Sequence, residues 1–362
     1  MSVLAAIAVL ALLIVVHELG HFVAARSQGI HVNRFSLGFG PTLFKYQGAE
    51  TEYAVRAFPL GGYVGFPDDD PDSKIPFNDP NLLRNRPVLD RAIVISAGVI
   101  ANLIFAYCLL VTQIATIGVQ QVNFQPGVLV ADVAKDVSST AVNAGIKKGD
   151  IILAADDIDL GASQQASPSL RQLIQDRANQ PLPLLIQRDN KTLSVSVTPE
   201  AGPDGKGRIG VQLAPNSKVE RHHVANLVEA FRTGAGQFQQ IVVLTVQGFV
   251  QLVSNFSQTA GQLAGPVQIV KIGASIAQSD AGSLFQFAAL ISINLAVINI
   301  LPLPALDGGQ LAFLLIEGLR GKPLPAKFQD GVMQTGLMVL LGLGIFLIVR
   351  DTANLEWVQN LF

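Results

Sequence analysis

The stretch SVLAAIAVLALLIVVHELGHFVAA, residues 2–25, determines the class of this protein. It is apolar apart from a few side chains near its end, among them His17, Glu18 and His21. About 20 such residues in a helix cross the roughly 30 Å hydrocarbon core of a bilayer. No basic segment precedes the stretch, and it is longer than the apolar region of a signal peptide, so we expect a retained membrane helix. An ionisable group inside such a helix is costly, and it indicates a functional site.

Three further stretches have the same character: Ala92–Val119, Leu284–Leu303 and Gly331–Val349. Among the residues of the four stretches, Glu18 is the only Asp, Glu, Lys or Arg. The whole chain of 362 residues is 49% hydrophobic and 14% charged, with a net charge of −2 and one cysteine. These values exclude a disordered chain, a nucleic-acid-binding protein and a disulfide-stabilised scaffold. The sequence therefore predicts a multi-pass α-helical membrane protein with four transmembrane helices and a water-soluble part.

Basic residues predict the orientation of the chain in the membrane. Lys and Arg are frequent between Arg26 and Arg91, and Arg320, Lys322 and Lys327 follow the third stretch. By the positive-inside rule, both connections lie on the cytoplasmic side. The long segment 120–283 then lies outside.

The cytoplasmic segment 30–66 is not simply polar. Residues 36–40 and 51–58 alternate between apolar and polar side chains, which is typical of paired β-strands. Non-helical backbone at membrane depth persists only where it packs on protein or lines a water-filled cavity. We therefore expect a membrane-associated β-hairpin that dips between the helices.

The outward segment is predicted to contain a small α+β module. Four strands are expected at 127–133, 151–155, 184–188 and 193–198, with helices at 138–144 and 170–178. Residues 224–262 are weakly amphipathic, with aromatic residues among glutamines. We expect them to form helices on or near the bilayer surface and not a fifth span.

The sequence His17-Glu18-Leu19-Gly20-His21 fits the pattern H-E-x-x-H. Residues four apart share one face of a helix, so both imidazoles can reach one ion. Zinc binds histidine nitrogen, and a catalytic zinc site keeps a position for water. Glu18 is then placed to accept the proton of that water, and the motif predicts a hydrolytic zinc site.

A third zinc ligand is usual, and spacing alone leaves its identity open. His31 lies too far along the first helix, and the pair His222-His223 is expected to lie outside the membrane on the protein surface. Asp307 follows Pro302 and Pro304 in irregular backbone at the end of the third span, on the side of His21. An Asp before Gly-Gly is more often a turn residue or helix cap, so both readings of Asp307 stay open.

The combination of H-E-L-G-H with N-I-L-P-L-P-A-L-D-G at 299–308 resembles the site-2 protease family of intramembrane zinc metalloproteases. The resemblance continues through the G-F-G at 38–40, P-L-G-G-Y-V at 59–64, G-P-V at 265–267 and S-I-N-L at 292–295. It implies one Zn²⁺ per chain, held by His17, His21 and Asp307, with Glu18 as the catalytic base. It also implies that Asn294 and Asn299 bind the extended substrate backbone beside a hairpin strand at Gly38 and Gly40.

The outward module resembles a PDZ domain through A-G-I-K-K-G-D-I-I at 144–152. The strand containing Gly127, Val128, Leu129 and Val130 is then expected to border a groove that binds a ligand peptide, with residues 168–178 on its other side. The alternative is a module that binds no peptide and only excludes bulky substrates by its size. A single PDZ copy resembles the cyanobacterial and Gram-positive branch of the family.

These observations predict four parts of the chain. Residues 1–119 form an N-terminal membrane half, 120–215 an inserted PDZ-like domain, 216–283 an amphipathic connection and 284–362 a C-terminal membrane half. The resemblance implies an intramembrane zinc endopeptidase of the bacterial plasma membrane that cleaves single-span membrane proteins, such as anti-sigma factors or remnant signal peptides. The expected enzyme has its active site toward the cytoplasm and its PDZ domain outside. The expected partners are these substrates, membrane lipid and a PDZ ligand peptide, with no nucleic acid.

Two alternatives come from another class of protein: a zinc transporter, or a non-catalytic PDZ scaffold. A transporter is expected to have paired polar residues along several spans. Only the first and third spans carry such features, and the second and fourth are expected to be bland. A degenerate protease is expected to lack a ligand or the base, and none is missing.

Overall fold

A computed structural model describes residues 2–70, 73–133, 140–259, 261, 263–280 and 282–353. Within these residues the chain divides into two compact units. The membrane unit groups Met1–Ile117 with His223–Phe362, and the inserted unit is Gly118–His222. The predicted division of the chain into four parts stays a prediction, and each unit is described by itself below.

Four helices in the described part of the chain are long and apolar enough to cross a membrane: α1 (Ser2–Ser27), α2 (Val88–Thr116), α8 (Ser283–Ile300) and α10 (Ala326–Ala353). The prediction of four spans is confirmed. The third span ends at Ile300, three residues before the predicted end, because Leu301 has an extended backbone and Pro302 cannot continue the helical hydrogen bonds. The second span ends at Thr116, and a strand begins at Val119.

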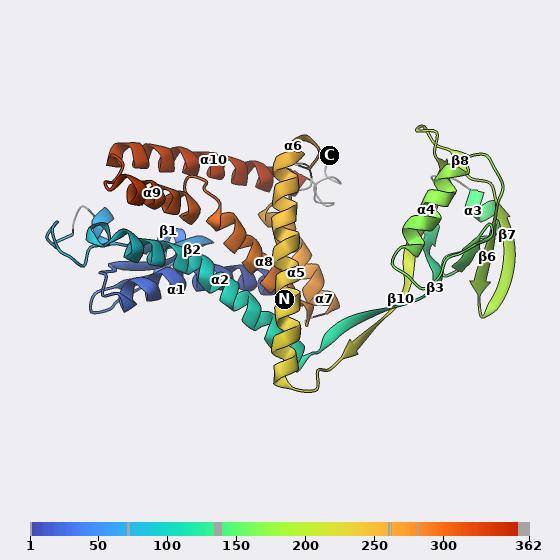
Figure 1. Cartoon of the computed structure of the whole chain (residues 1–362), viewed down its shortest axis with the longest axis horizontal. Coiled ribbons are helices and arrows are strands. Elements are labelled where there is room, and N and C mark those ends of the chain that lie inside the picture. The colour runs from blue at the N-terminus through green and yellow to red at the C-terminus, as the bar shows by residue number, and fades with distance from the viewer. Residues whose placement is uncertain are drawn as a thin grey trace. The chain divides into compact units, whose positions relative to one another are not determined.

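The helix α2 is central to the membrane unit, since it packs against α1 and α8 (Figure 1). Close packing of α1 on α2 depends on a small residue, because a Cβ at Gly20 would lie 2.7 Å from Cβ of Ala101. The helix α9 (Asp307–Arg320) also packs on α2, where Arg91 forms an ion pair with Glu317. These contacts connect α1, α8 and α9 through one helix.

The predicted hairpin is present as β1 (Arg34–Gln47) and β2 (Glu52–Gly65), and both strands fold back on themselves. Residues 34–37 pair with 52–55 in the parallel sense and, on their other side, with 65–62 in the opposite order. Residues 44–47 complete the set by pairing with 55–52. The result is a small curled sheet, with Gly62 in a segment that pairs with β1.

Residues 227–254 form one continuous helix, α5 (Leu227–Ser254), where the sequence predicts several surface helices. Asn226 caps it by accepting a hydrogen bond from the N–H of Glu229. In Figure 1 the helix α5 stands upright, roughly perpendicular to α10. Its residues Phe238, Ile241 and Val242 pack on a buried cluster that includes Leu110 of α2 and Ile293 of α8. Further helices among the described residues of this region are α6 (Phe256–Thr259) and α7 (Pro266–Ser279), and short 3₁₀ turns at Pro67–Asp69 and Leu83–Asn85 precede α2.

The inserted unit contains a main sheet with strand order β10-β3-β4-β6-β7, in which β5 pairs with β4, and a separate two-stranded sheet of β8 and β9. Its strands are β3 (Val119–Val133), β4 (Ile151–Ala155), β5 (Ile158–Asp159), β6 (Leu182–Arg188), β7 (Lys191–Val197), β8 (Glu200–Ala201), β9 (Gly207–Arg208) and β10 (Val211–His222). Its helices are α3 (Thr140–Asn143) and α4 (Ala166–Asp176). The four predicted strands are confirmed, and residues 138 and 139 of the first predicted helix lie outside the described residues.

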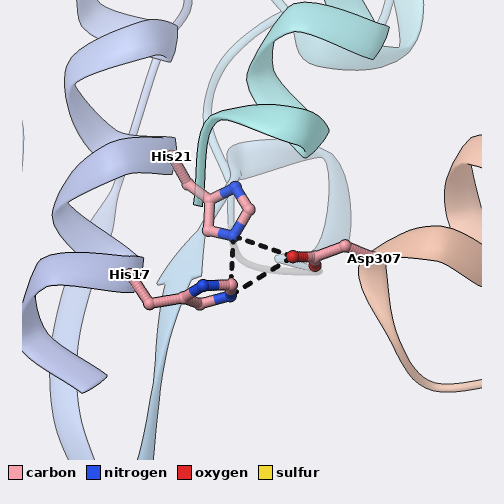
Figure 2. Close-up of side chains that lie close together, drawn as sticks. All are labelled: His17, His21 and Asp307. Atoms are coloured by element: carbon pink, nitrogen blue, oxygen red, sulfur yellow. Dashed lines mark hydrogen bonds and ion pairs between the residues drawn. The ribbon is translucent and has the colours of Figure 1, made fainter. Parts of the chain in front are cut away.

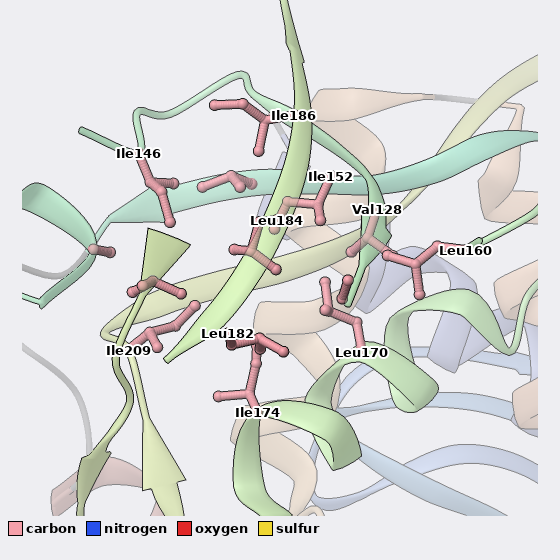
Figure 3. Close-up of a cluster of buried hydrophobic side chains, with 14 of the residues drawn as sticks. Val128, Ile146, Ile152, Leu160, Leu170, Ile174, Leu182, Leu184, Ile186 and Ile209 are labelled. Carbon is pink, nitrogen blue, oxygen red and sulfur yellow. The ribbon is translucent and has the colours of Figure 1, made fainter. Parts of the chain in front are cut away.

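One continuous apolar cluster holds the inserted unit together (Figure 3). Leu170 and Ile174 of α4 pack on Val128, Ile152 and Leu184 of the sheet. Alternate residues of β6 enter this cluster, as expected for a strand with one buried face.

Candidate metal centre

The two histidines of H-E-L-G-H share one face of α1, as their spacing predicts. Their Nε2 atoms lie 3.3 Å apart, and both are close to the carboxylate of Asp307, which faces them from the start of α9 (Figure 2). The distances from Asp307 Oδ2 are 3.2 Å to His17 Nε2 and 3.5 Å to His21 Nε2. Residues about 290 positions apart in the sequence therefore present three candidate ligand atoms to one point.

Local backbone geometry explains how Asp307 reaches the histidines. The helix α8 stops at Ile300, and the following loop turns through Ala305, which has a positive φ of 72°. The two residues after Asp307 have no room for a side chain, since a Cβ at Gly308 or Gly309 would collide with backbone carbonyls of residues 300–303. The sequence D-G-G thus starts α9 tightly against the end of α8 and aims its first side chain back at α1.

These three side chains fit a zinc ion. Ligand atoms about 2.0–2.1 Å from one ion in a tetrahedral arrangement are themselves roughly 3.3 Å apart, close to the three distances found here. Asp307 Oδ2 is buried and has no hydrogen-bond partner among the described residues. A buried carboxylate oxygen without a donor is costly, and a cation would satisfy it. Two imidazole nitrogens and one carboxylate oxygen are a donor set that zinc prefers.

Glu18 lies beside the ligands in a cavity of about 580 Å³ that His17, His21 and Asp307 also line. The glutamate is 9% exposed. The curled sheet covers it from one side, because a Cβ at Gly62 would lie only 2.8 Å from Glu18 Cγ. A carboxylate, a candidate metal site and space for water and a peptide therefore meet in one cavity between the helices.

The second span, α2, is expected to lack the polar features of the first and third spans. It contacts both histidines, so that expectation is wrong. The backbone carbonyl of Val94 lies 2.8 Å from His21 Nδ1, and the side chain of Asn102 lies 3.4 Å from His17 Nδ1. Gly98 stands between them, where a Cβ would lie 2.7 Å from His17 Cε1. Sequence reasoning missed these residues, although a lone Asn four residues after a Gly in an apolar span is a detectable signal.

Of the residues expected to bind substrate, the structure places Asn299 at the cavity and the others away from its wall. Asn299 lines the cavity, with Nδ2 3.4 Å from His17 Nε2. Asn294 instead accepts a hydrogen bond of 3.1 Å from Thr245 of α5. Gly38 and Gly40 both have positive φ and pack against Phe58, so the adjacent Phe39, and not the glycines, contributes to the cavity wall.

The predicted peptide groove beside Gly127, Val128, Leu129 and Val130 requires correction. Val128 and Leu129 of β3 pair with β10 on one side and with β4 on the other, so no edge is open there for an added strand. A cavity of about 570 Å³ lies instead between α4 and residues 207–213. Among the described residues β10 pairs only with β3, and it is therefore an edge strand next to this cavity. The order of strands in the sheet, which local sequence patterns do not specify, decides this point.

Comparison with known proteins gives a consistent result. The pattern of peptidase family M50 matches residues 5–343. The chain is 69% identical over its full length, and over the full length of the relative, to "Putative zinc metalloprotease all3971" of Nostoc sp.. It is 48% identical to "Membrane metalloprotease ARASP, chloroplastic" of Arabidopsis thaliana, over 99% of this chain and 80% of the relative.

The fold and these similarities define a membrane metalloprotease that uses zinc. The chain belongs to peptidase family M50, the site-2 protease family. Membership in this family, with relatives named as zinc metalloproteases, favours an enzyme over the transporter and the non-catalytic scaffold.

Proposed function

We propose that this protein is an intramembrane endopeptidase that cleaves the transmembrane segments of single-span membrane proteins. The observation that carries the proposal is the convergence of His17, His21 and Asp307 beside Glu18 in one cavity, with His17, Glu18 and His21 in a helix long and apolar enough to span a membrane. A peptide bond in a membrane helix is protected by internal hydrogen bonds and by the absence of water. A cavity lined by polar side chains among the helices gives such a peptide bond access to water and room to unwind.

In the proposed mechanism, His17, His21 and Asp307 hold one zinc ion per chain. Zinc, when bound, supplies a Lewis acid that polarises the scissile carbonyl and makes water acidic. Glu18 accepts the proton of the attacking water and passes it to the leaving amine. Asn299, at the cavity wall, is positioned to donate to backbone groups of an unwound substrate. The curled sheet at Gly62 limits the space above Glu18 and favours an extended chain over a helix.

Glu18→Gln tests the proposal, because it keeps the shape of the side chain and removes its basicity. Membranes from cells that carry only Glu18→Gln are expected to accumulate single-span fragments, which mass spectrometry identifies. Purified wild-type protein in detergent should cleave those fragments, and Glu18→Gln should be slower by about 10²–10⁴-fold, the usual contribution of a general base. Full cleavage by Glu18→Gln would show the mechanism to be wrong.

We also propose that the cavity faces the cytoplasm and the inserted unit the opposite side of a bacterial plasma membrane. The eight basic residues of the segment that runs from Arg26 to Arg91, both included, support this orientation. Lys206→Cys in the inserted unit should react with a membrane-impermeant maleimide in intact cells. Lys74→Cys should react only after lysis, and the opposite pattern would reverse the topology.

For the inserted unit we propose that an extended peptide adds to the open edge of β10 beside α4. The support is the cavity along residues 207–213. A photoreactive residue in place of Gln212, which is exposed, should crosslink to discrete peptides. Steric exclusion of bulky substrates without binding, the other expectation for this unit, predicts no such products.

A further inference from the structure

The far sides of both imidazoles face α2, which contributes no residue to the candidate ligand group of His17, His21 and Asp307. Val94, Gly98 and Asn102 are spaced four residues apart and so form one stripe on this helix. The carbonyl of Val94 lies 2.8 Å from Nδ1 of His21, and this contact leaves Nε2 of His21 free to face Asp307. At the other end of the stripe, Asn102 stands opposite Nδ1 of His17 at 3.4 Å.

The protonation of a metal-binding imidazole determines what Asn102 must provide. A neutral imidazole carries one proton, and a ring that offers the Nε2 lone pair to a cation keeps that proton on Nδ1. Nδ1–H of His17 is then a donor and needs an acceptor. The amide oxygen of Asn102 is such an acceptor, and a half-turn about χ2 exchanges it with Nδ2, which faces the ring in the structure.

The surroundings of Asn102 support this assignment. Asn102 is fully buried, with 0% of its surface exposed, and its Oδ1 has no hydrogen-bond partner among the described residues. A buried amide oxygen without a donor is costly unless another state of the protein uses it. The backbone at this position is also held, because the hydroxyl of Ser292 in α8 donates to the carbonyl of Asn102 at 2.8 Å. The side chain therefore extends from a fixed point of the helix packing toward His17.

We propose that Asn102 is a positioning residue for the metal centre. Its side-chain oxygen accepts a hydrogen bond from Nδ1–H of His17, which fixes the tautomer and the rotation of the ring so that Nε2 points at the shared site. Outer-sphere partners of this kind change metal affinity by about 10–100-fold. The inference rests on the zinc site of the proposed function, but it does not depend on which peptide is cleaved.

The test measures the affinity of the full-length protein in detergent for Zn²⁺ alone, by competition with a chromogenic chelator. Asn102→Leu has a similar size and lacks the acceptor, and we expect it to weaken zinc binding about 10–100-fold. Asn102→Asp keeps an acceptor and should bind zinc within about threefold of wild type, since carboxylates commonly hold metal-binding histidines. Gln113→Leu is the matched control, because Gln113 is a buried amide of the same helix that lies eleven residues from Asn102. It should leave zinc affinity unchanged.

A second readout separates positioning from a general loss of structure. The absorption spectrum of the Co²⁺-loaded protein reports the ligand geometry, and it should change for Asn102→Leu but not for Gln113→Leu. Wild-type zinc affinity in folded Asn102→Leu would overturn the proposal. If Asn102→Leu does not fold, a tenfold weakening in Asn102→Asp would overturn it, and retained affinity would support it.

These measurements distinguish failure of the Asn102 proposal from failure of the proposed function. Zinc-loaded wild-type protein whose Glu18→Gln variant still cleaves would refute the catalytic mechanism and leave the role of Asn102 intact. A wild-type protein that binds no zinc would overturn both.

Discussion

Two buried aspartates, one in each unit, are treated in opposite ways by this protein. Asp150 in the inserted unit is 1% exposed, and both its oxygens are hydrogen-bonded. Arg188 donates to each oxygen at 2.7 Å, and the N–H of Lys147 donates to Oδ2 at 2.8 Å. Asp307 in the membrane unit has a buried oxygen, Oδ2, that forms no hydrogen bond among the described residues and lies near only the Nε2 atoms of His17, at 3.2 Å, and His21, at 3.5 Å.

The difference is the one expected between a structural carboxylate and the proposed metal ligand. A buried charge that stabilises a fold needs all its acceptor positions filled, and the Arg188 guanidinium fills those of Asp150 with a bidentate pair. A carboxylate that binds a metal must keep a lone pair for the cation. The satisfied aspartate is therefore assigned a structural role, and the unsatisfied one is the proposed metal ligand. The following predictions test that contrast, from the largest expected effect to the smallest.

Asp307→Ala should remove zinc binding and leave the fold in place, because it deletes a proposed ligand whose Oδ2 has no hydrogen-bond partner. We expect zinc affinity to fall by more than about 100-fold, beyond the effect typical of an outer-sphere partner. Metal analysis of the purified protein measures this. Asp79→Ala is the matched control, since Asp79 also lies near a histidine, His31, at 3.8 Å. Equal zinc content in Asp307→Ala and wild type would contradict the assignment.

Asp150→Asn should have the reverse result. It removes the charged acceptor of the Arg188 guanidinium, whose side chain is 25% exposed and which keeps the carbonyl of Gly145 as an acceptor, and we expect a loss of about 3 kcal/mol from the stability of the inserted unit. Hydrogen exchange with mass spectrometry on the full chain should show faster exchange in β4 and β6, with unchanged zinc content. Asp204→Asn, which removes an exposed ion pair with Arg208, should have little effect.

The ion pair of Asp150 and Arg188 should also make the stability of the inserted unit depend on pH. Burial raises the pKa of Asp150, but the hydrogen bonds from Arg188 and from the N–H of Lys147 outweigh it and hold the pKa below the ordinary value of 3.8. The folded pKa is thus lower than the unfolded one, so this stabilisation is complete above the unfolded pKa and is lost as pH falls through the folded pKa. The advantage of wild type over Asp150→Asn in exchange protection should therefore be constant near neutral pH and shrink below about pH 4. A constant advantage down to pH 2 would contradict it.

Gly98→Ala should be smaller in effect and specific to the metal centre. The added Cβ would lie 2.7 Å from His17 Cε1 and still closer to His21, so both rings must move. We expect zinc affinity to fall by about 10-fold, as for a disturbed outer-sphere contact. Gly344→Ala in α10, where a Cβ meets nothing within 4 Å, is the control. An unchanged affinity in Gly98→Ala would show that the rings do not depend on α2.

Much of this molecule follows from short-range patterns. The four spans, the strands of the inserted unit and the histidine pair were predictable, because helix length, strand alternation and four-residue spacing act within one element. The third ligand was left open by spacing and was implied only by resemblance. The peptide groove was placed on the wrong strand, since nothing local in residues 127–130 reveals that both edges of β3 are paired.

The sequence by itself determined that this is a membrane protein with a zinc-binding motif in its first helix, because apolar length and the H-E-x-x-H spacing need no partner to be read. Only the tertiary structure decided that Asp307 meets His17 and His21, and that Asn102 stands behind His17. Those contacts join residues of α1, α2 and α9 that are between 85 and 290 positions apart. They depend on how helices pack against one another, and a local pattern carries no record of that packing.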